Sequence, residues 1–379
     1  MHEALIVQVG RTPFGARHGR FARRHPAELL GGAFAAVLAE SGADPEAVDE
    51  VLVGCATPVG AQAGNLAGAA ARASGCSKGA PASVVSTRDT SSLTALIRAV
   101  DAVRSGRCGV VLVGGVELMS TVPAGADMSH RGFGLPLPPT QGEALPPPGP
   151  AAEQWAQRHG VGRDRLESLA QRSRRRAREA QTAGRLAAEL LPPTRGVSQT
   201  AAGDELLGAG ETEARGLAEG LYSGGGLLTA ATVAPMADGA AAAVVASPSA
   251  ARRLGLEPVA RVVAEAAVGG DPGAGCGSSP SAARRALAIA GVTAGDVRRV
   301  ELAELFATGI AHWESSCPDL AEALNPDGGS LALGHPQGAT GLGLLARLER
   351  GLASLGGGAN GLAACDAVDG HGVAVLLET

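Results

Sequence analysis

The stretches "AESGADPEAVDEVLVG" at residues 39–54 and "AIAGVTAGDVRRVELAE" at residues 288–304 occupy the same place in two halves of the chain. In each stretch the period of a helix gives way to an apolar strand. A helix-to-strand unit that recurs in this way predicts a pseudo-duplicated α/β fold, in which both halves repeat one pattern of strands and helices.

The first half contains further elements of this pattern. We expect a strand at residues 4–9, "ALIVQV", a helix from Pro26 and a strand at residues 51–53. A second helix over residues 90–105 then leads into the strongly apolar "GVVLVGG" at residues 109–115. Continuous apolar strands of this kind are buried on both faces of a sheet.

The second half repeats the pattern after residue 250. We expect a strand at residues 259–268, a helix and a strand within residues 279–304, a helix at residues 338–356 and a last strand at residues 372–378. Residues 119–224 are less regular: a proline-rich stretch precedes an amphipathic helix at 151–187, as expected of an inserted loop or lid domain.

These patterns predict three regions. Residues 1–118 together with residues 225–250 form the first α/β half, residues 119–224 form the loop domain, and residues 251–379 form the second half. The regions are long enough for a substantial core, because the chain has 379 residues, of which 45% are hydrophobic.

Composition and charge exclude several classes of function. The net charge of -5 leaves no basic face for nucleic acid. The N-terminus is too weakly apolar for a signal peptide, and no segment has the roughly 18 to 20 apolar residues that cross a bilayer. We therefore expect a soluble cytoplasmic protein with no membrane partner.

Two smaller features have structural interpretations. The arginine-rich "QRSRRRAR" at residues 171–178 fits a solvated helix face better than a docking site for a carrier or CoA phosphate. The six cysteines show no CxxC spacing, which argues against a disulfide framework and against a zinc site.

Six phrases, spread over nearly the whole chain, carry a family resemblance. They are "RTPFG" at 11–15, "GNLAGAAA" at 64–71, "GGVELMS" at 114–120, "ADGAAAAVVAS" at 237–247, "ELAELFA" at 301–307 and "GGSLALGHPQGATG" at 328–341. With them the chain resembles the thiolases over residues 4–378. The resemblance implies a five-layer αβαβα fold with an inserted loop domain.

Thiolase chemistry uses a cysteine nucleophile, the histidine of "GHP", a second cysteine near the C-terminus and a water held by the asparagine of "NEAF". Counting back 25 residues from Gly114, the family spacing places Asp89 at the nucleophile position. A shift of one residue, which aligns Arg88 with a family arginine, places Thr90 there instead. Neither alignment supplies a cysteine.

The second cysteine position falls on Asp366 when "GLAACDAVDGHG" is matched without gaps to the family phrase. Cys365 lies one position earlier, and it takes the cysteine's place only in a shifted register. Because neighbouring residues of a strand face opposite sides, we expect the Cys365 side chain to point away from the site unless a bulge intervenes.

His335 of "GHP" remains, and we expect it in the active cleft together with Asp89 and Asp366 as catalytic residues. Ala303 replaces the family asparagine, and Ala234 replaces a serine on the CoA side, which weakens the support for an oxyanion. The resemblance implies substrate contacts from residues next to these motifs: Thr90, Ser91, Ala303, Glu304, Phe306 and Gly334.

An Asp, His, Asp site supports three interpretations. In the first, the protein is an enzyme on an acyl thioester, in which Asp89 and His335 act as base and acid and Asp366 moves or orients a proton. Acyl transfer without an enzyme-bound intermediate, hydrolysis, decarboxylation and dehydration all fit this pair. Ordinary thiolysis and Claisen condensation do not, because an aspartate is a poor nucleophile towards a thioester.

The second interpretation is a non-catalytic subunit that pairs with an active thiolase or another acyl-transfer enzyme. The third is a metal-dependent enzyme, in which Asp89, His335 and Asp366 bind iron, manganese or zinc. The resemblance itself implies no resident cofactor and no metal. It implies a CoA thioester or an acyl group on a carrier protein as substrate, and a homodimer or homotetramer.

Overall fold

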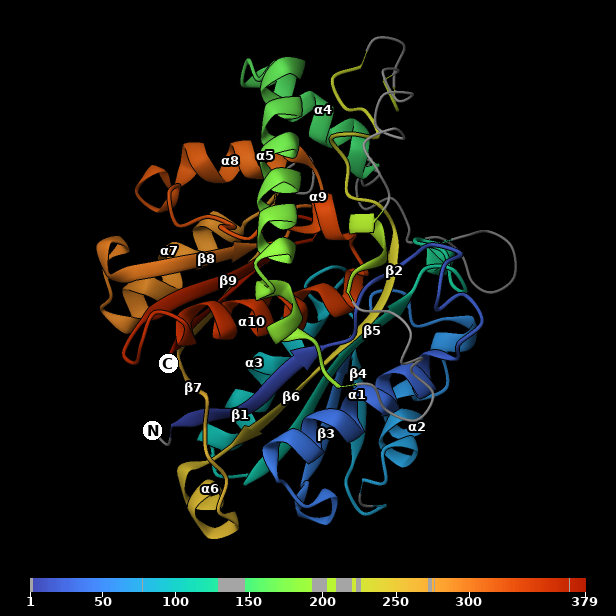
Figure 1. Ribbon diagram of the computed structural model, residues 1–379, viewed down its shortest axis with the longest axis vertical. Coiled ribbons are helices and arrows are strands. Elements are labelled where there is room, and N and C mark those ends of the chain that lie inside the picture. Colours follow the sequence, from blue (N-terminus) through green and yellow to red (C-terminus); the bar gives the residue numbers. More distant parts are fainter. Residues whose placement is uncertain are drawn as a thin grey trace.

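The computed structural model describes residues 3–76, 78–128, 147–192, 203–208, 220–222, 226–271, 275, 277–367 and 369–379. In these residues one mixed sheet runs through the protein in the order β4-β3-β5-β6-β1-β7-β10-β9-β8, with the short β2 beside β6 (Figure 1). The strands are β1 Ala4–Arg11, β2 Gly15–Ala16, β3 Glu50–Gly54, β4 Ala82–Val85, β5 Val110–Leu118, β6 Ala237–Ala246, β7 Ala260–Val268, β8 Val297–Leu302, β9 Asn360–Asp366 and β10 Gly372–Glu378.

Helices cover the sheet in layers. The α-helices are α1 Pro26–Ser41, α2 Leu66–Ala73, α3 Ser91–Arg104, α4 Pro148–Arg158, α5 Arg163–Thr182, α6 Pro248–Leu254, α7 Ser279–Ala290, α8 Ala307–Ser316, α9 Ser330–Leu333 and α10 Gln337–Ala353. Helices α1 and α2 pack outside the first half of the sheet, and α7 packs outside the second half, while α3 and α10 contact both halves between them. This is the five-layer αβαβα arrangement that the sequence predicts.

The repeated stretch has the same local structure in both halves. Helices α1 and α7 end at Gly42 and Gly291, whose φ angles of 69° and 67° lie in the left-handed region that glycine adopts without strain. In each half the chain then makes a one-turn 3₁₀-helix and enters a strand. The 3₁₀-helix at Pro45–Ala47 leads into β3, and the one at Ala294–Asp296 leads into β8. The predicted pseudo-duplication is therefore confirmed.

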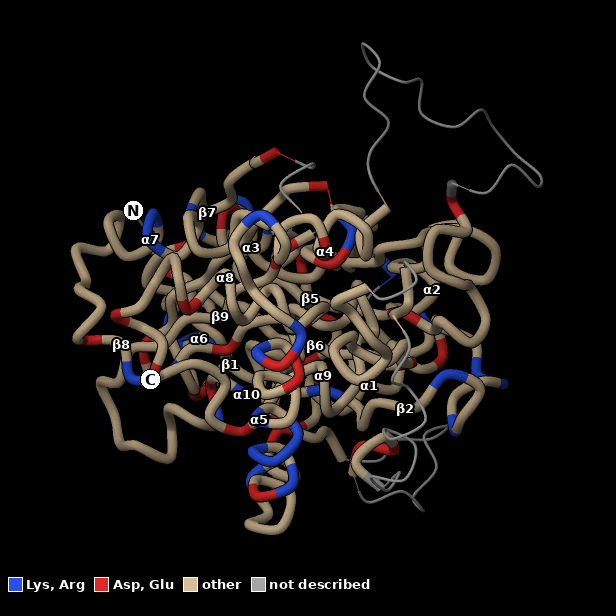
Figure 2. Tube along the Cα trace, turned by 90° about the horizontal axis from the view of Figure 1, so that it is seen from above, with Lys and Arg blue, Asp and Glu red and all other residues tan. Residues whose placement is uncertain are grey.

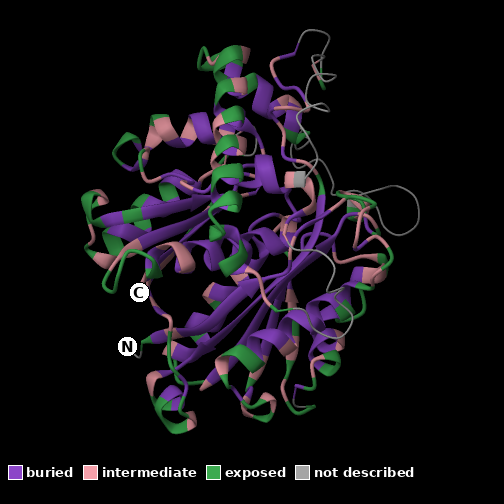
Figure 3. Cartoon of the chain, viewed as in Figure 1, coloured by how far each residue is buried: buried purple, intermediate pink, exposed green. Residues whose placement is uncertain are grey.

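The two halves join where β1 pairs antiparallel with β7. Strands β5 and β6 lie in the interior of the first half, and every residue of both is buried, as expected for strands covered on both faces (Figure 3). Strand β6 consists largely of alanine, which lets α1 and α10 approach its two faces closely.

The insertion differs from the single helix predicted at residues 151–187. Two helices, α4 and α5, occupy this region, and the chain turns between them at Gly160, whose φ is 65°. The sequence "HGVG" at 159–162 places two glycines where the helix would have to continue, which favours a break. Most of the predicted proline-rich stretch lies outside the described residues. In the described part of the chain, no helix has the length and apolar character to cross a bilayer.

Buried ion pairs connect the insertion to the core. Arg11 at the end of β1 lies 2.5 Å from Glu189 and 2.6 Å from Asp204, and its side chain is fully buried. Glu189 also pairs with Arg347 of α10 at 3.1 Å. Burial opposes the ionisation of Asp204, but the charge of Arg11, together with the hydrogen bonds from Arg11 and the Phe14 amide, holds the pKa of Asp204 below its usual value.

We expect Arg11→Met to lower the free energy of unfolding by about 3–5 kcal/mol, because it leaves the buried Asp204 without its ion-pair partner and removes one of the two arginines that pair with Glu189. Denaturation in urea measures this change. The matched control is Arg175→Met, because Arg175 pairs with Glu179 at 3.9 Å on the exposed face of α5 and its loss should change little. Equal stability of the two variants would contradict the structural role of the buried pairs.

Candidate active site

Asp89 lies in a tight turn that leads into α3. Arg88 has a φ of 53°, in the left-handed region that residues with a side chain seldom adopt. The turn closes through hydrogen bonds from the Thr90 amide to the Thr87 carbonyl (3.2 Å) and from the Ser91 amide to the Arg88 carbonyl (3.1 Å). It thereby holds Asp89 at the start of α3, in the central helical layer.

His335 stands at the equivalent place before α10. Gly334 precedes it with a φ of 92°, and a Cβ atom there would come within 2.7 Å of Leu206 and 2.8 Å of Ala237. The His335 amide donates to the Pro235 carbonyl at 2.9 Å, which fixes the backbone of the "GHP" motif next to the segment before β6. The motif therefore needs glycine at residue 334 for its shape, and this shape fixes the backbone position of His335.

The two turns bring Asp89 and His335 together, although 246 positions separate them. His335 Nε2 lies 2.8 Å from Asp89 Oδ1, and His335 Nδ1 lies 2.9 Å from the Thr340 hydroxyl. Both side chains are buried, and Asp89 Oδ2 has no hydrogen-bond partner among the described residues. In the neutral tautomer that receives a bond from Thr340, His335 donates to Asp89 and leaves Oδ2 able to accept a proton.

Asp366 makes its hydrogen bonds with a different element. Its Oδ1 accepts from the Ser279 amide at 2.6 Å and its Oδ2 from the Ser279 hydroxyl at 2.7 Å, at the N-terminus of α7. Burial raises the pKa of Asp366 to about 6, the bonds from Ser279 oppose this rise, and the charge of Asp89 adds to it. The charge of Asp89 thus affects the pKa of Asp366, although the hydrogen bonds of Asp366 are with Ser279.

The prediction that the Cys365 side chain points away from the site is wrong. The side chain faces the side of β9 opposite Asp366, as strand alternation requires, but this side is the one that contains Asp89. The Cys365 thiol donates to the Asp89 carbonyl at 3.2 Å. Complete burial, with the nearby charges of Asp89 and Asp366, raises the pKa of Cys365 well above that of an ordinary thiol.

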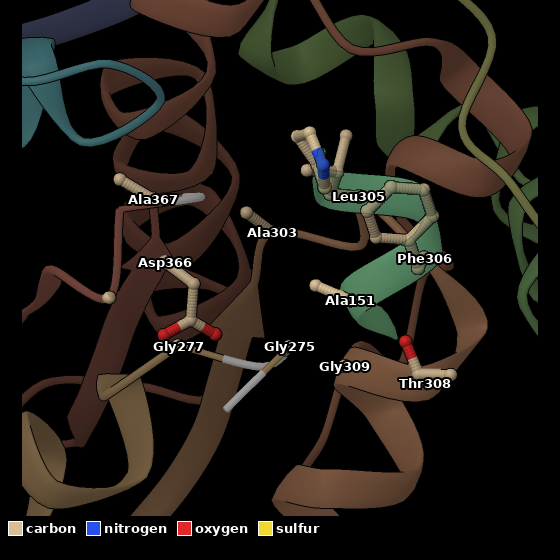
Figure 4. Close-up of a pocket in the computed structure, with 12 residues that line it drawn as sticks. Ala151, Gly275, Gly277, Ala303, Leu305, Phe306, Thr308, Gly309, Asp366 and Ala367 are labelled. Carbon is tan, nitrogen blue, oxygen red and sulfur yellow. The ribbon is translucent and has the colours of Figure 1, made fainter. Parts of the chain in front are cut away.

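A pocket opens beside Asp366 (Figure 4). Its described lining residues are Pro148, Ala151, Gly275, Gly277, Ala303, Leu305, Phe306, Thr308, Gly309, Asp366, Ala367 and Gly370. Two of the substrate-binding residues predicted from the sequence, Ala303 and Phe306, are therefore in this lining. Thr308 was missed, and its one signal is that it follows Phe306 by two positions at the start of α8.

The predicted binding residues Thr90, Ser91 and Glu304 are buried and are not among the described residues that line the pocket. The Thr90 hydroxyl donates to the Thr87 carbonyl at 2.6 Å, and the Ser91 hydroxyl donates to the Arg88 carbonyl, so both hold the turn around Asp89. Glu304 accepts bonds from Ser173 and Asn325, each at 2.6 Å. In this conformation Thr90, Ser91 and Glu304 support the architecture of the site.

Two further expectations can be compared with the geometry. Among the described residues, no group of three or more His, Cys, Asp or Glu side chains has the arrangement of a metal site, so the metal interpretation finds no support.

The arginines of α5 partly point inward: Arg172 pairs with Glu314 at 2.5 Å, Arg176 donates to the Leu324 carbonyl at 2.7 Å, and Arg174 donates to the Ala231 carbonyl. Figure 2 shows this basic run along α5.

Comparisons with known proteins agree with the fold. Residues 4–249 match the thiolase N-terminal domain family, and residues 256–379 match the thiolase C-terminal domain family. A 3-ketoacyl-CoA thiolase of Cronobacter sakazakii is 34% identical over the full length of both chains. A steroid 3-ketoacyl-CoA thiolase of Mycobacterium tuberculosis is 31% identical over 94% of this chain and 89% of its own.

Two solved structures have a fold similar to that of this chain. Human mitochondrial 3-ketoacyl-CoA thiolase in complex with CoA has a TM-score of 0.89 at 27% identity, covering 100% of this chain and 98% of the human chain. The acetyl-CoA acetyltransferase of Bacillus anthracis has a TM-score of 0.88 at 26% identity, covering 100% and 99%.

The raised pKa of Asp366 predicts how the stability of the protein depends on pH. The pKa of Asp366 is about 6 in the folded state and about 3.8 for an exposed aspartate of the unfolded chain, so the folded state holds the proton to higher pH and stability falls as pH rises through this window. Asp366→Asn cannot titrate, so its stability relative to the native protein should increase between pH 4 and pH 7, by at most about 3 kcal/mol. Urea denaturation at both pH values measures this, and a difference that does not change with pH would contradict the shifted pKa.

Proposed function

The chain belongs to the thiolase family, and from this premise we propose that it acts on an acyl thioester by proton transfer through the Asp89–His335 pair, without an acyl group bound to a cysteine. The observation that carries the proposal is the 2.8 Å contact between Asp89 Oδ1 and His335 Nε2 at the junction of α3 and α10. The finer proposal is that Asp89 and Asp366 stand where the family uses its two cysteines.

A CoA thioester is the proposed substrate. The relatives are named as 3-ketoacyl-CoA thiolases, and a structure of similar fold was solved with CoA. The pocket beside Asp366 has a mostly apolar lining with two polar side chains, Thr308 and Asp366, which is the composition typical of small-molecule sites. An acyl group on a carrier protein would present the same thioester.

The names of the relatives favour ordinary thiolase chemistry, which would need a reactive thiolate at this site. Cys365 is the cysteine that contacts Asp89, and its thiol is fully buried and bonded to a carbonyl oxygen. Its raised pKa keeps it in the unreactive thiol form at neutral pH. These properties support a route that does not pass through Cys365.

The pair can perform the necessary proton transfers. Asp89 Oδ2, which has no partner among the described residues, accepts the proton of an attacking water or thiol while His335 stabilises the carboxylate from Oδ1. The attack breaks the carbonyl carbon–sulfur bond, and the departing thiolate receives the proton back. The net reaction is transfer of the acyl group to water or to a thiol.

A second candidate function is a non-catalytic subunit of an acyl-transfer assembly. The observation that favours it is the near-complete burial of the pair, with 1% of Asp89 and 3% of His335 exposed. Strand β4 ends the sheet among the described strands, and such an edge can pair with another chain. A homodimer or homotetramer would use a surface of this kind.

Thiol release from a panel of acyl-CoA substrates, together with intact mass spectrometry, tests the proposal. We expect release without a covalent adduct in the native protein, and a loss of at least about 100-fold in Asp89→Asn and His335→Gln, because general acid-base groups contribute this much. Cys365→Ser should retain the activity within a few-fold. An acyl adduct on Cys365, or loss of activity in Cys365→Ser alone, would refute the proposal.

Restoring a thiol at residue 89 gives an independent test. Because His335 Nε2 lies beside this position, the new thiol in Asp89→Cys should ionise and become acylated. Intact mass spectrometry should then show one added acyl group, which digestion locates at residue 89. Absence of an adduct, together with no thiol release by the native protein, would favour the non-catalytic subunit.

A further inference from the structure

The pocket beside Asp366 has few polar groups. Of its described lining residues, Asp366 and Thr308 alone have polar side chains, and the others are glycine, alanine, proline, leucine or phenylalanine. Figure 4 shows Asp366 on one side of the pocket and Phe306 and Thr308 on the other. Such sparse polar groups orient a bound molecule and select its chemistry.

Asp366 makes its side of the pocket an acceptor of hydrogen bonds. Ser279 supplies one bond to each carboxylate oxygen, and each oxygen has a further lone pair. Asp89 is a second carboxylate close enough to influence Asp366, and no Lys or Arg is among the described lining residues. His312 bonds to Gly277 nearby, but burial lowers its pKa, so it adds no positive charge at neutral pH.

Thr308 adds a second polar group that the protein leaves unsatisfied. Its side chain is fully buried, and its Oγ1 atom has no hydrogen-bond partner among the described residues. Buried hydroxyl groups nearly always have a partner, supplied by protein, water or ligand. A ligand group between Thr308 and Asp366 would complete the bonding of both.

We propose that this pocket is an acyl subsite that selects a short acyl group with a hydrogen-bond donor at its distal end, a hydroxyl or an ammonium group, and that it rejects an acyl group ending in a carboxylate. The proposal rests on the proposed binding of an acyl thioester. A donor satisfies Asp366 and the Thr308 hydroxyl together, whereas a carboxylate meets the charge of Asp366 without a described cation to offset it.

Binding rather than turnover tests the selectivity. The probes are CoA analogues in which a methylene group separates the sulfur from the carbonyl, so that they cannot be cleaved. They carry butyryl, 3-hydroxypropionyl, 3-aminopropionyl or succinyl groups, the first three of which have equal numbers of heavy atoms. By calorimetry we expect the hydroxyl and amino analogues to bind about tenfold more tightly than butyryl, and the succinyl analogue about tenfold more weakly.

Two matched variants assign the selectivity to its residues. Asp366→Asn keeps the shape and can keep both bonds to Ser279, and it should abolish most of the preference for amino over succinyl. Thr308→Val removes the hydroxyl at constant volume and should weaken the hydroxyl analogue several-fold, whereas Thr308→Ser should not. Thermal unfolding confirms that each variant is folded.

The outcomes separate the selectivity from the proposed function. If all four analogues bind the native protein equally, the selectivity is refuted while thioester binding stands. If the preference persists in both Asp366→Asn and Thr308→Val, these residues do not cause it and the inference fails. If none of the analogues binds, the proposed function and the inference fail together.

Discussion

The close approach of α3 and α10 to the sheet is the constraint on which the site depends. A Cβ atom at Gly115 of β5 would lie 2.7 Å from both the Gly338 carbonyl and Ser92, and a Cβ atom at Gly341 would lie 2.7 Å from Leu93. The helices can therefore meet at their N-terminal turns only because these positions have no side chain. Asp89 and His335 stand immediately before the two turns, so this packing determines the distance between them.

The same packing buries several ionisable groups wholly or in part. Burial raises the pKa values of Cys365 and Asp366, and Glu117, which accepts the amides of Ala56 and Gly338, has its pKa raised to about 7. Glu117 and Asp366 accept hydrogen bonds from backbone amides and from side chains, which offset part of the cost of burial, whereas the Cys365 thiol donates to the Asp89 carbonyl. These bonds orient the three side chains.

The thiolase fold and the chemistry of the proposed site are separable. The fold needs the glycines, the buried strands and the ion pairs around Arg11, and none of these depends on the identity of residue 89 or residue 366. An aspartate at residue 89 keeps its hydrogen bond to His335. The architecture can thus support a different reaction with the same positions, which is common among widely used folds.

The sequence by itself determined the repeated halves, because Gly42 and Gly291 end corresponding helices and the strands that follow are apolar. It also indicated Asp89, His335 and Asp366 as one set, through their spacing from recognisable motifs. The break at Gly160 was missed, although Gly160 and Gly162 favour it, because the amphipathic period continues on both sides of it. Thr308 was also missed, because a single threonine in a helix has no distinctive pattern.

Only the tertiary structure decided which side chains meet. Asp366 bonds to Ser279, whereas the neighbouring Cys365 contacts Asp89 from the opposite face of β9. Strand alternation shows that these two residues face opposite ways, but not which helical layer lies on which side. Which helical layer lies on which side depends on contacts between segments that are far apart in the chain. The geometry of these contacts follows from the packing of α3, α7 and α10 against the sheet.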